Sequence, residues 1–89
     1  MAKRILLLDD DALIRSILGD ALEARGYQFL PAATGGQADA LLAKALPDLL
    51  IVDGLLPDTR GVEWIARHRN ELGSRPIFFI SAFWKDSAT

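Results

Sequence analysis

The chain has 89 residues, of which 51% are hydrophobic and 25% charged, with a formal net charge of -2 and no cysteine. This length allows one domain of ordinary globular composition. The absence of cysteine excludes a disulfide framework and thiolate zinc sites, and the small negative charge gives no footprint for direct binding of nucleic acid or of an anionic membrane.

The first two predicted elements are a buried strand and an amphipathic helix. Residues 4–8 are a short apolar run, typical of a strand buried on both faces in a parallel sheet. This run is too short for a signal-peptide core or a membrane span, so we expect a cytoplasmic protein. Asp11 is placed to cap the helix, and Gly26 to end it. The apolar stripe of this helix consists of Leu13, Ile14, Ile17, Leu18, Ala21 and Leu22.

Three further strands alternate with two further helices. Residues 27–32 predict a strand, and Pro31 within it favours an edge position because proline cannot donate to a ladder. Thr34 begins a capping box for a helix that must end before Pro47. A strand at 48–53, a helix at 61–72 and a strand at 76–81 complete the order βαβαβαβ.

This alternation predicts an open α/β sheet with helices on both faces, because strands joined by single helices pair in parallel through right-handed crossovers. Such sheets bind ligands beyond the carboxyl ends of their strands. Asp9 and Asp10 follow the first strand, Asp53 ends the third, and Ser81 ends the fourth. A lone carboxylate at the mouth of a buried strand, such as Asp53, is costly unless its charge is used. We therefore expect a cation site at this edge.

The pattern resembles the receiver domain of bacterial response regulators in two-component signalling. The resemblance rests on the acidic residues after the first strand, on Asp53 followed by Pro57 and Gly61, and on Ser81-Ala82 after the fourth strand. It covers essentially the whole chain, residues 1–89, as one domain. It implies a flavodoxin-like (CheY-like) three-layer sheet with strand order 2-1-3-4, acting in a phosphorelay rather than as an enzyme.

The resemblance also implies a phosphoacceptor and a metal site. Asp53 would accept a phosphoryl group from a sensor histidine kinase or a phosphotransfer protein, after which the domain would change a protein-protein surface. Mg²⁺ would be held by Asp9, Asp10, Asp53 and the backbone carbonyl of Leu55. These oxygen ligands suit Mg²⁺, which keeps several waters and neutralises charge during phosphoryl transfer.

Other expected phosphoryl contacts lie near the end of the chain. Ser81 would donate a hydrogen bond to a phosphoryl oxygen, and the small residues Gly54 and Ala82 would leave room for the phosphate. Receivers place a lysine after a fifth strand, but this chain ends at Thr89, and Lys85 follows Ser81 too closely to replace it. We expect a receiver that is incomplete at its C-terminus, lacking the fifth strand and helix, either as a fragment or as a minimal form. The fourth strand would then be an exposed edge that could form a homodimer.

Two other functions stay open at this point. A pseudo-receiver would bind a partner without phosphotransfer, which the missing lysine favours. A phosphohydrolase of the haloacid dehalogenase type would use Asp9 as its nucleophile together with Ser81, but it would leave Asp53 without a role. Asp11 fits a helix cap better than a metal ligand. His68 lies on the apolar stripe of its helix, so we expect it to pack at a boundary rather than to bind a ligand.

Overall fold

The structure, a computed structural model, describes residues 2–80. Four parallel strands form one sheet in the order β2-β1-β3-β4, which confirms the predicted order. The strands are β1 (Arg4–Leu8), β2 (Gln28–Ala32), β3 (Leu49–Asp53) and β4 (Ile77–Ile80). The helices within the described residues are α1 (Ala12–Ala24), α2 (Gly35–Lys44), α3 (Gly61–Arg67) and α4 (Arg69–Leu72). None of these helices has the length and apolar character needed to cross a bilayer.

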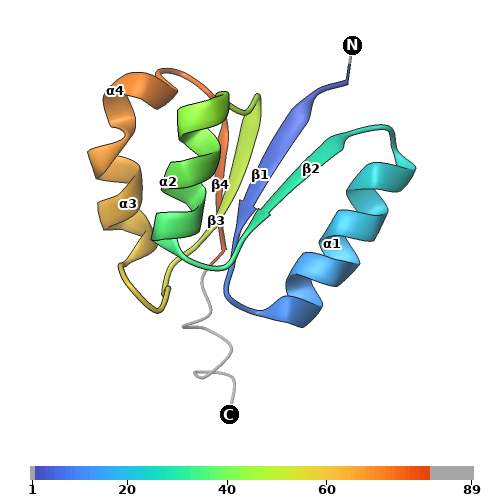
Figure 1. Cartoon of the computed structure of the whole chain (residues 1–89), viewed down its shortest axis with the longest axis horizontal. Coiled ribbons are helices and arrows are strands. Elements are labelled where there is room, and N and C mark those ends of the chain that lie inside the picture. Colours follow the sequence, from blue (N-terminus) through green and yellow to red (C-terminus); the bar gives the residue numbers. More distant parts are fainter. Residues whose placement is uncertain (1, 81–89) are drawn as a thin grey trace.

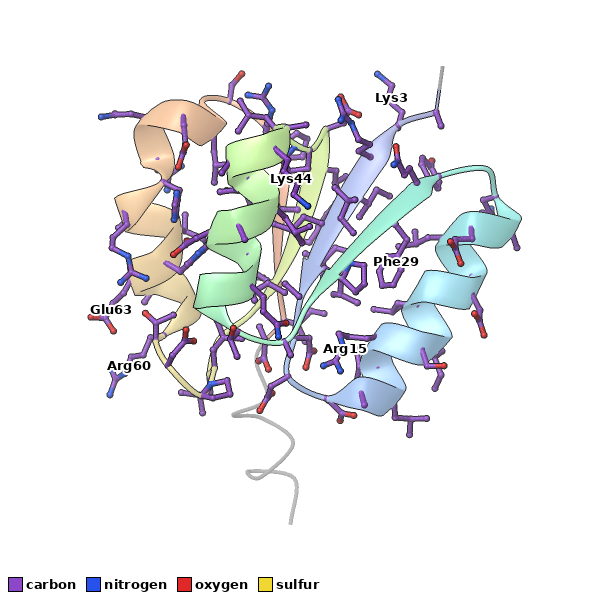
Figure 2. The ribbon with its side chains drawn as sticks, viewed as in Figure 1. Lys3, Arg15, Phe29, Lys44, Arg60 and Glu63 are labelled. Carbon is purple, nitrogen blue, oxygen red and sulfur yellow. The ribbon has the colours of Figure 1, made fainter. Side chains whose placement is uncertain are left out.

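The sheet lies between two helical layers (Figure 1). On one face, α1 packs on β2, where Gly19 meets the ring of Phe29; Figure 2 shows Phe29 reaching from β2 toward α1. The other face carries the main hydrophobic core, in which side chains of β1 and β3 pack against α2, α3 and α4. Members of that core include Leu6, Leu8, Leu50, Val52, Ala38, Leu42, Trp64, Ile65 and Leu72.

The predicted helix caps are present. The side chain of Asp11 accepts hydrogen bonds from the backbone N–H groups of Leu13 and Ile14, and so begins α1. Gly26 follows the helix with a φ of 89°, a conformation that favours glycine. Thr34 accepts from the N–H of Gln37 and begins α2. Local sequence therefore determines where both helices begin.

The burial of α1 differs from the predicted stripe. Leu13 is 65% exposed, Ile17 is 56% exposed and Ala21 is exposed as well, so these three members of the predicted apolar stripe do not face the sheet. The helix packs mainly on the edge strand β2 and covers only part of its face of the sheet. Its inward line therefore consists of Ile14, Leu18, Gly19 and Leu22.

The predicted helix at 61–72 is divided in two at His68. The N–H of His68 is shared between the carbonyls of Trp64 and Ile65, at 3.2 and 3.1 Å. The His68 ring stacks on Trp64 at a centroid distance of 4.6 Å and bonds to Asp39 of α2 and to Glu71 of α4. His68 is half-buried, as expected, but its ring also links three helices.

Candidate metal centre

Three carboxylates converge at the carboxyl edge of the sheet, the lower edge in Figure 1. Asp9 and Asp10 follow β1, while Asp53 ends the neighbouring strand β3. One oxygen from each of the three side chains lies within 4.8 Å of the others. Asp9 and Asp53 are only 2% and 4% exposed, whereas Asp10 faces solvent. The fold thus brings together the three acids that the sequence proposed as metal ligands.

Asp9 is held by contacts with the first turns of α1. Its Oδ1 accepts a hydrogen bond from the N–H of Asp11 at 2.9 Å. Its backbone carbonyl accepts another from Nη1 of Arg15 at 2.8 Å. Figure 2 shows Arg15 reaching from α1 toward this edge of the sheet. Asp11 is occupied as the cap of α1, which agrees with its predicted structural role.

The pKa of Asp53 is raised above its ordinary value, chiefly because burial disfavours the charged form. Repulsion from Asp9 and Asp10 raises it further, while backbone hydrogen bonds from Leu55 and Gly54 oppose the rise. The Leu55 N–H lies 3.4 Å from Oδ1 of Asp53. Three negative charges at this spacing repel one another, and a cation among the three carboxylates would relieve that repulsion.

The loop after Asp53 folds back against its own start. The N–H of Gly61 donates to the carbonyl of Gly54 at 3.0 Å, and Leu55 forms an antiparallel bridge with Arg60. A Cβ at position 61 would lie 2.2 Å from the backbone oxygen of Asp53, so this close approach requires glycine. The loop consequently holds the backbone of Leu55 beside Asp53.

The donor set fits a hard divalent cation. Three carboxylate oxygens at this spacing are the ligands that Mg²⁺ prefers, and the exposure of Asp10 leaves one side open to the waters that Mg²⁺ retains. Gly54 lies beside Asp53 and is half-buried. Ser81 and Ala82 lie outside the described residues, and the carbonyl of Leu55 stays a prediction.

Sequence reasoning missed several contacts around the site. The carboxylate of Asp58 accepts hydrogen bonds from the start of α2, a contact that the sequence did not indicate. Arg15 and the pair of acids around His68 were also missed. In each of these contacts the two residues are separated along the sequence, either by one or more helices or strands or by about a turn of helix. The caps at Asp11 and Thr34, by contrast, were readable from adjacent residues.

A family model described as "Response regulator receiver domain" matches residues 5–89. The chain is 40% identical over 84 residues to the phosphate regulon transcriptional regulatory protein PhoB of Pseudomonas aeruginosa, covering 92% of this chain and 37% of that protein. It is 38% identical over 85 residues to the transcriptional regulatory protein PhoP of Escherichia coli O157:H7, covering 93% of this chain and 38% of that protein. The chain therefore spans well under half the length of these curated relatives.

Solved structures share the same architecture. A chemotaxis response regulator of Vibrio cholerae matches with a TM-score of 0.84 and 30% identity, covering 89% of this chain and 68% of that chain. A response regulator receiver domain of Francisella matches with a TM-score of 0.81 and 24% identity, covering 90% of this chain and 66% of that chain. The second likeness supports the fold alone, and the first supports both the flavodoxin-like fold and the family.

Proposed function

The chain belongs to the response regulator receiver domain family, and from that premise we propose that it accepts a phosphoryl group on Asp53, with Mg²⁺ held by Asp9, Asp10 and Asp53. Receiver domains of response regulators are signalling domains of two-component systems, and they interact with histidine kinases or phosphotransfer proteins. The observation that carries the proposal is the convergence of three acids around a buried Asp53 whose pKa is raised.

In the proposed reaction, a carboxylate oxygen of Asp53 attacks the phosphorus of a phosphohistidine on the donor protein. A phosphorus-oxygen bond forms on Asp53, the phosphorus-nitrogen bond breaks, and the histidine nitrogen leaves with its electron pair. Both the nucleophile and the phosphoryl group are negative, so they repel each other. Bound Mg²⁺ would supply the charge neutralisation that this transfer needs.

The residues of the chain would orient the reacting groups. The Leu55 N–H holds one oxygen of Asp53 at 3.4 Å, which limits rotation of the carboxylate. Asp9 is fixed at both its backbone and its side chain, so its position changes little when a cation arrives. Preorganised charge of this kind favours transfer because little rearrangement is needed during the reaction.

The remaining predicted contacts belong to the same proposal. Ile80 pairs with Asp53 in the sheet, and its carbonyl accepts from the Gly54 N–H at 2.8 Å, so the described part of β4 ends beside the site. We assign Ser81 as the donor to a phosphoryl oxygen and the Leu55 carbonyl as a metal ligand. Gly54 and Ala82 would leave room for the phosphate.

We also propose that the outer edge of β4 pairs with a second copy of the chain. In the sheet formed by residues 2–80, β4 is an edge strand, and its Phe78 and Phe79 are 57% and 46% exposed. An exposed apolar edge readily recruits another strand. Solution scattering over a range of concentrations should show a rising mass, whereas a constant monomer mass would contradict the dimer.

Intact-protein mass spectrometry tests the phosphoacceptor assignment. The chain is incubated with Mg²⁺ and a small phosphodonor, and the mass is compared with those of Asp53→Asn, Asp9→Asn and, as a matched control, Asp11→Asn. We expect one added phosphoryl group in the wild type and in Asp11→Asn, and none in Asp53→Asn. No addition in the wild type would support a partner-binding pseudo-receiver, and loss only in Asp9→Asn would support a hydrolase.

A further inference from the structure

The carboxylate of Asp58 joins two parts of the chain that are distant in sequence. Asp58 lies in the loop between β3 and α3. Its Oδ1 accepts from the N–H of Gly35 at 2.9 Å, and its Oδ2 accepts from the N–H of Gly36 at 3.0 Å. Those two N–H groups belong to the first residues of α2 and have no partner within the helix. These two hydrogen bonds lower the pKa of Asp58, and the bond from the Gly35 N–H has the larger effect.

This link is additional to the helix's own cap. Thr34 already begins α2, with its hydroxyl oxygen accepting from the N–H of Gln37 at 3.1 Å. The start of α2 also packs closely on the loop: a Cβ at Gly35 would lie 2.9 Å from the methyl carbon of Thr59 and 3.2 Å from the Trp64 ring. Asp58 therefore fastens the loop onto α2, rather than supplying a cap that the helix lacks.

The loop leads from this link directly back to the metal centre. The Leu56 N–H donates to the carbonyl of Thr59 at 3.1 Å, and Leu55 pairs with Arg60 across the loop. Leu55 in turn lies against Asp53 through its backbone N–H. Figure 1 shows the start of α2 and the loop after β3 at the same edge of the sheet. Fixing the tip of the loop at Asp58 thus fixes the position of Leu55.

We propose that Asp58 is a positioning residue, which holds the loop of residues 54–60 on the start of α2 and thereby raises the affinity of the metal centre for a divalent cation. The inference rests on the proposed function of that centre. A loop that is ordered before the cation arrives loses less entropy on binding, so the affinity is higher. Because coupling between two sites is reciprocal, cation binding should also strengthen the contact of Asp58 with α2.

Calorimetric titration with MgCl₂ tests this role with three variants. Asp58→Asn removes one acceptor oxygen and the charge. Asp58→Glu keeps the charge, but its extra methylene prevents both oxygens from meeting the two N–H groups with the loop in place. Asp20→Asn is the matched control, because Asp20 is an exposed acid of α1 and its replacement changes the net charge by the same amount.

We expect both Asp58 variants to weaken Mg²⁺ binding by about tenfold, the lower end of the range for residues that support metal ligands indirectly. Asp20→Asn should bind Mg²⁺ like the wild type. Mg²⁺ should also slow amide hydrogen exchange at Gly35 and Gly36 in the wild type and not in the Asp58 variants. A purely structural role would lower stability without moving the affinity or this protection.

The failures of the two proposals are distinguishable. If the wild type binds Mg²⁺, Asp53→Asn does not, and both Asp58 variants bind as tightly as Asp20→Asn, the role of Asp58 is overturned and the metal centre stands. Retained affinity in Asp58→Glu alone would also overturn it, because charge rather than geometry would explain Asp58→Asn. If the wild type does not bind Mg²⁺, both proposals fail.

Discussion

Replacing Asp53 with asparagine should stabilise the metal-free chain and remove the stabilisation that Mg²⁺ provides. Asparagine keeps nearly the same shape and an oxygen that can accept from the Leu55 N–H. It removes a buried charge that Asp9 and Asp10 repel. The free energy of unfolding of the metal-free chain should therefore increase, although a side chain of the proposed site has been lost.

The spacing of the acids gives the magnitude. At the 4.8 Å limit of the site, two like charges repel by about 0.9 kcal/mol in water and about 3.5 kcal/mol at an effective dielectric constant of 20. Asp9 is buried and belongs near the upper figure, while Asp10 is exposed and belongs near the lower one. The neutral asparagine oxygen accepts the backbone hydrogen bond of Leu55 more weakly than a carboxylate does, which offsets about 1 kcal/mol of this gain in stability. The expected gain is about 3 kcal/mol, or about 4–8 °C in Tm for each kcal/mol.

Urea unfolding with EDTA and with excess Mg²⁺ measures both effects. In EDTA the variant should unfold at higher urea than the wild type. At a Mg²⁺ concentration about a hundred times Kd, the wild type should gain about 2.7 kcal/mol and the variant little. Asp20→Asn again serves as the charge control. A variant that is less stable in EDTA would show that Asp53 is not repelled by its neighbours, and one that gains as much from Mg²⁺ as the wild type would show that Asp53 is not a metal ligand.

Three further predictions concern the same region. Because the folded-state pKa of Asp53 is raised, the metal-free fold binds a proton more tightly than the unfolded chain does. The stability of the metal-free fold should therefore rise as pH falls from the raised pKa toward the ordinary one. Urea midpoints measured across pH should show this slope in the wild type, and an equal slope in Asp53→Asn would contradict it. Gly61→Ala should lower the free energy of unfolding in urea by about 1–3 kcal/mol, because its Cβ would clash with the Asp53 carbonyl. A Cβ at Gly54 meets only ordinary contacts, so Gly54→Ala should lower it by about 1 kcal/mol or less. Equal losses of stability would argue against the loop geometry. Trp64→Phe should lower the free energy of unfolding by about 1–3 kcal/mol, because Trp64 is fully buried and its Nε1 donates to Asp39 at 2.9 Å. A double-mutant cycle with Asp39→Asn should show coupling between the two residues. Additive losses of stability would count against this hydrogen bond.

The sequence predicted the parallel sheet and the convergence of the acids from chain-local signals, whereas the strand order was implied by the resemblance to receiver domains. Apolar runs bounded by glycine, proline and capping residues placed the strands and most of the helices. Parallel pairing then required Asp9, Asp10 and Asp53 to meet at one edge, whatever their distance along the chain. Pro31 likewise indicated the edge position of β2, which the strand order confirms.

The errors arose where a residue's environment depends on distant partners. Helical periodicity gave a face to α1 but could not show how much of the sheet that helix covers, so the exposure of Leu13 and Ile17 was missed. The predicted 61–72 helix is divided at His68, whose ring bonds to Asp39 in α2. In the sequence, the strand β3 lies between α2 and His68. Nothing in the sequence around Asp58 indicated its contact with α2.

Anomalous scattering from crystals soaked in MnCl₂ would show whether the three acids bind one divalent cation, because Mn²⁺ takes the same oxygen ligands as Mg²⁺. We expect one strong peak at the carboxyl edge of the sheet, with side-chain oxygens of Asp9, Asp10 and Asp53 around it and the carbonyl of Leu55 beside it. A crystal in which the side chains of Asp10 and Asp53 point away from each other, or in which the ion binds elsewhere, would overturn the proposed metal centre.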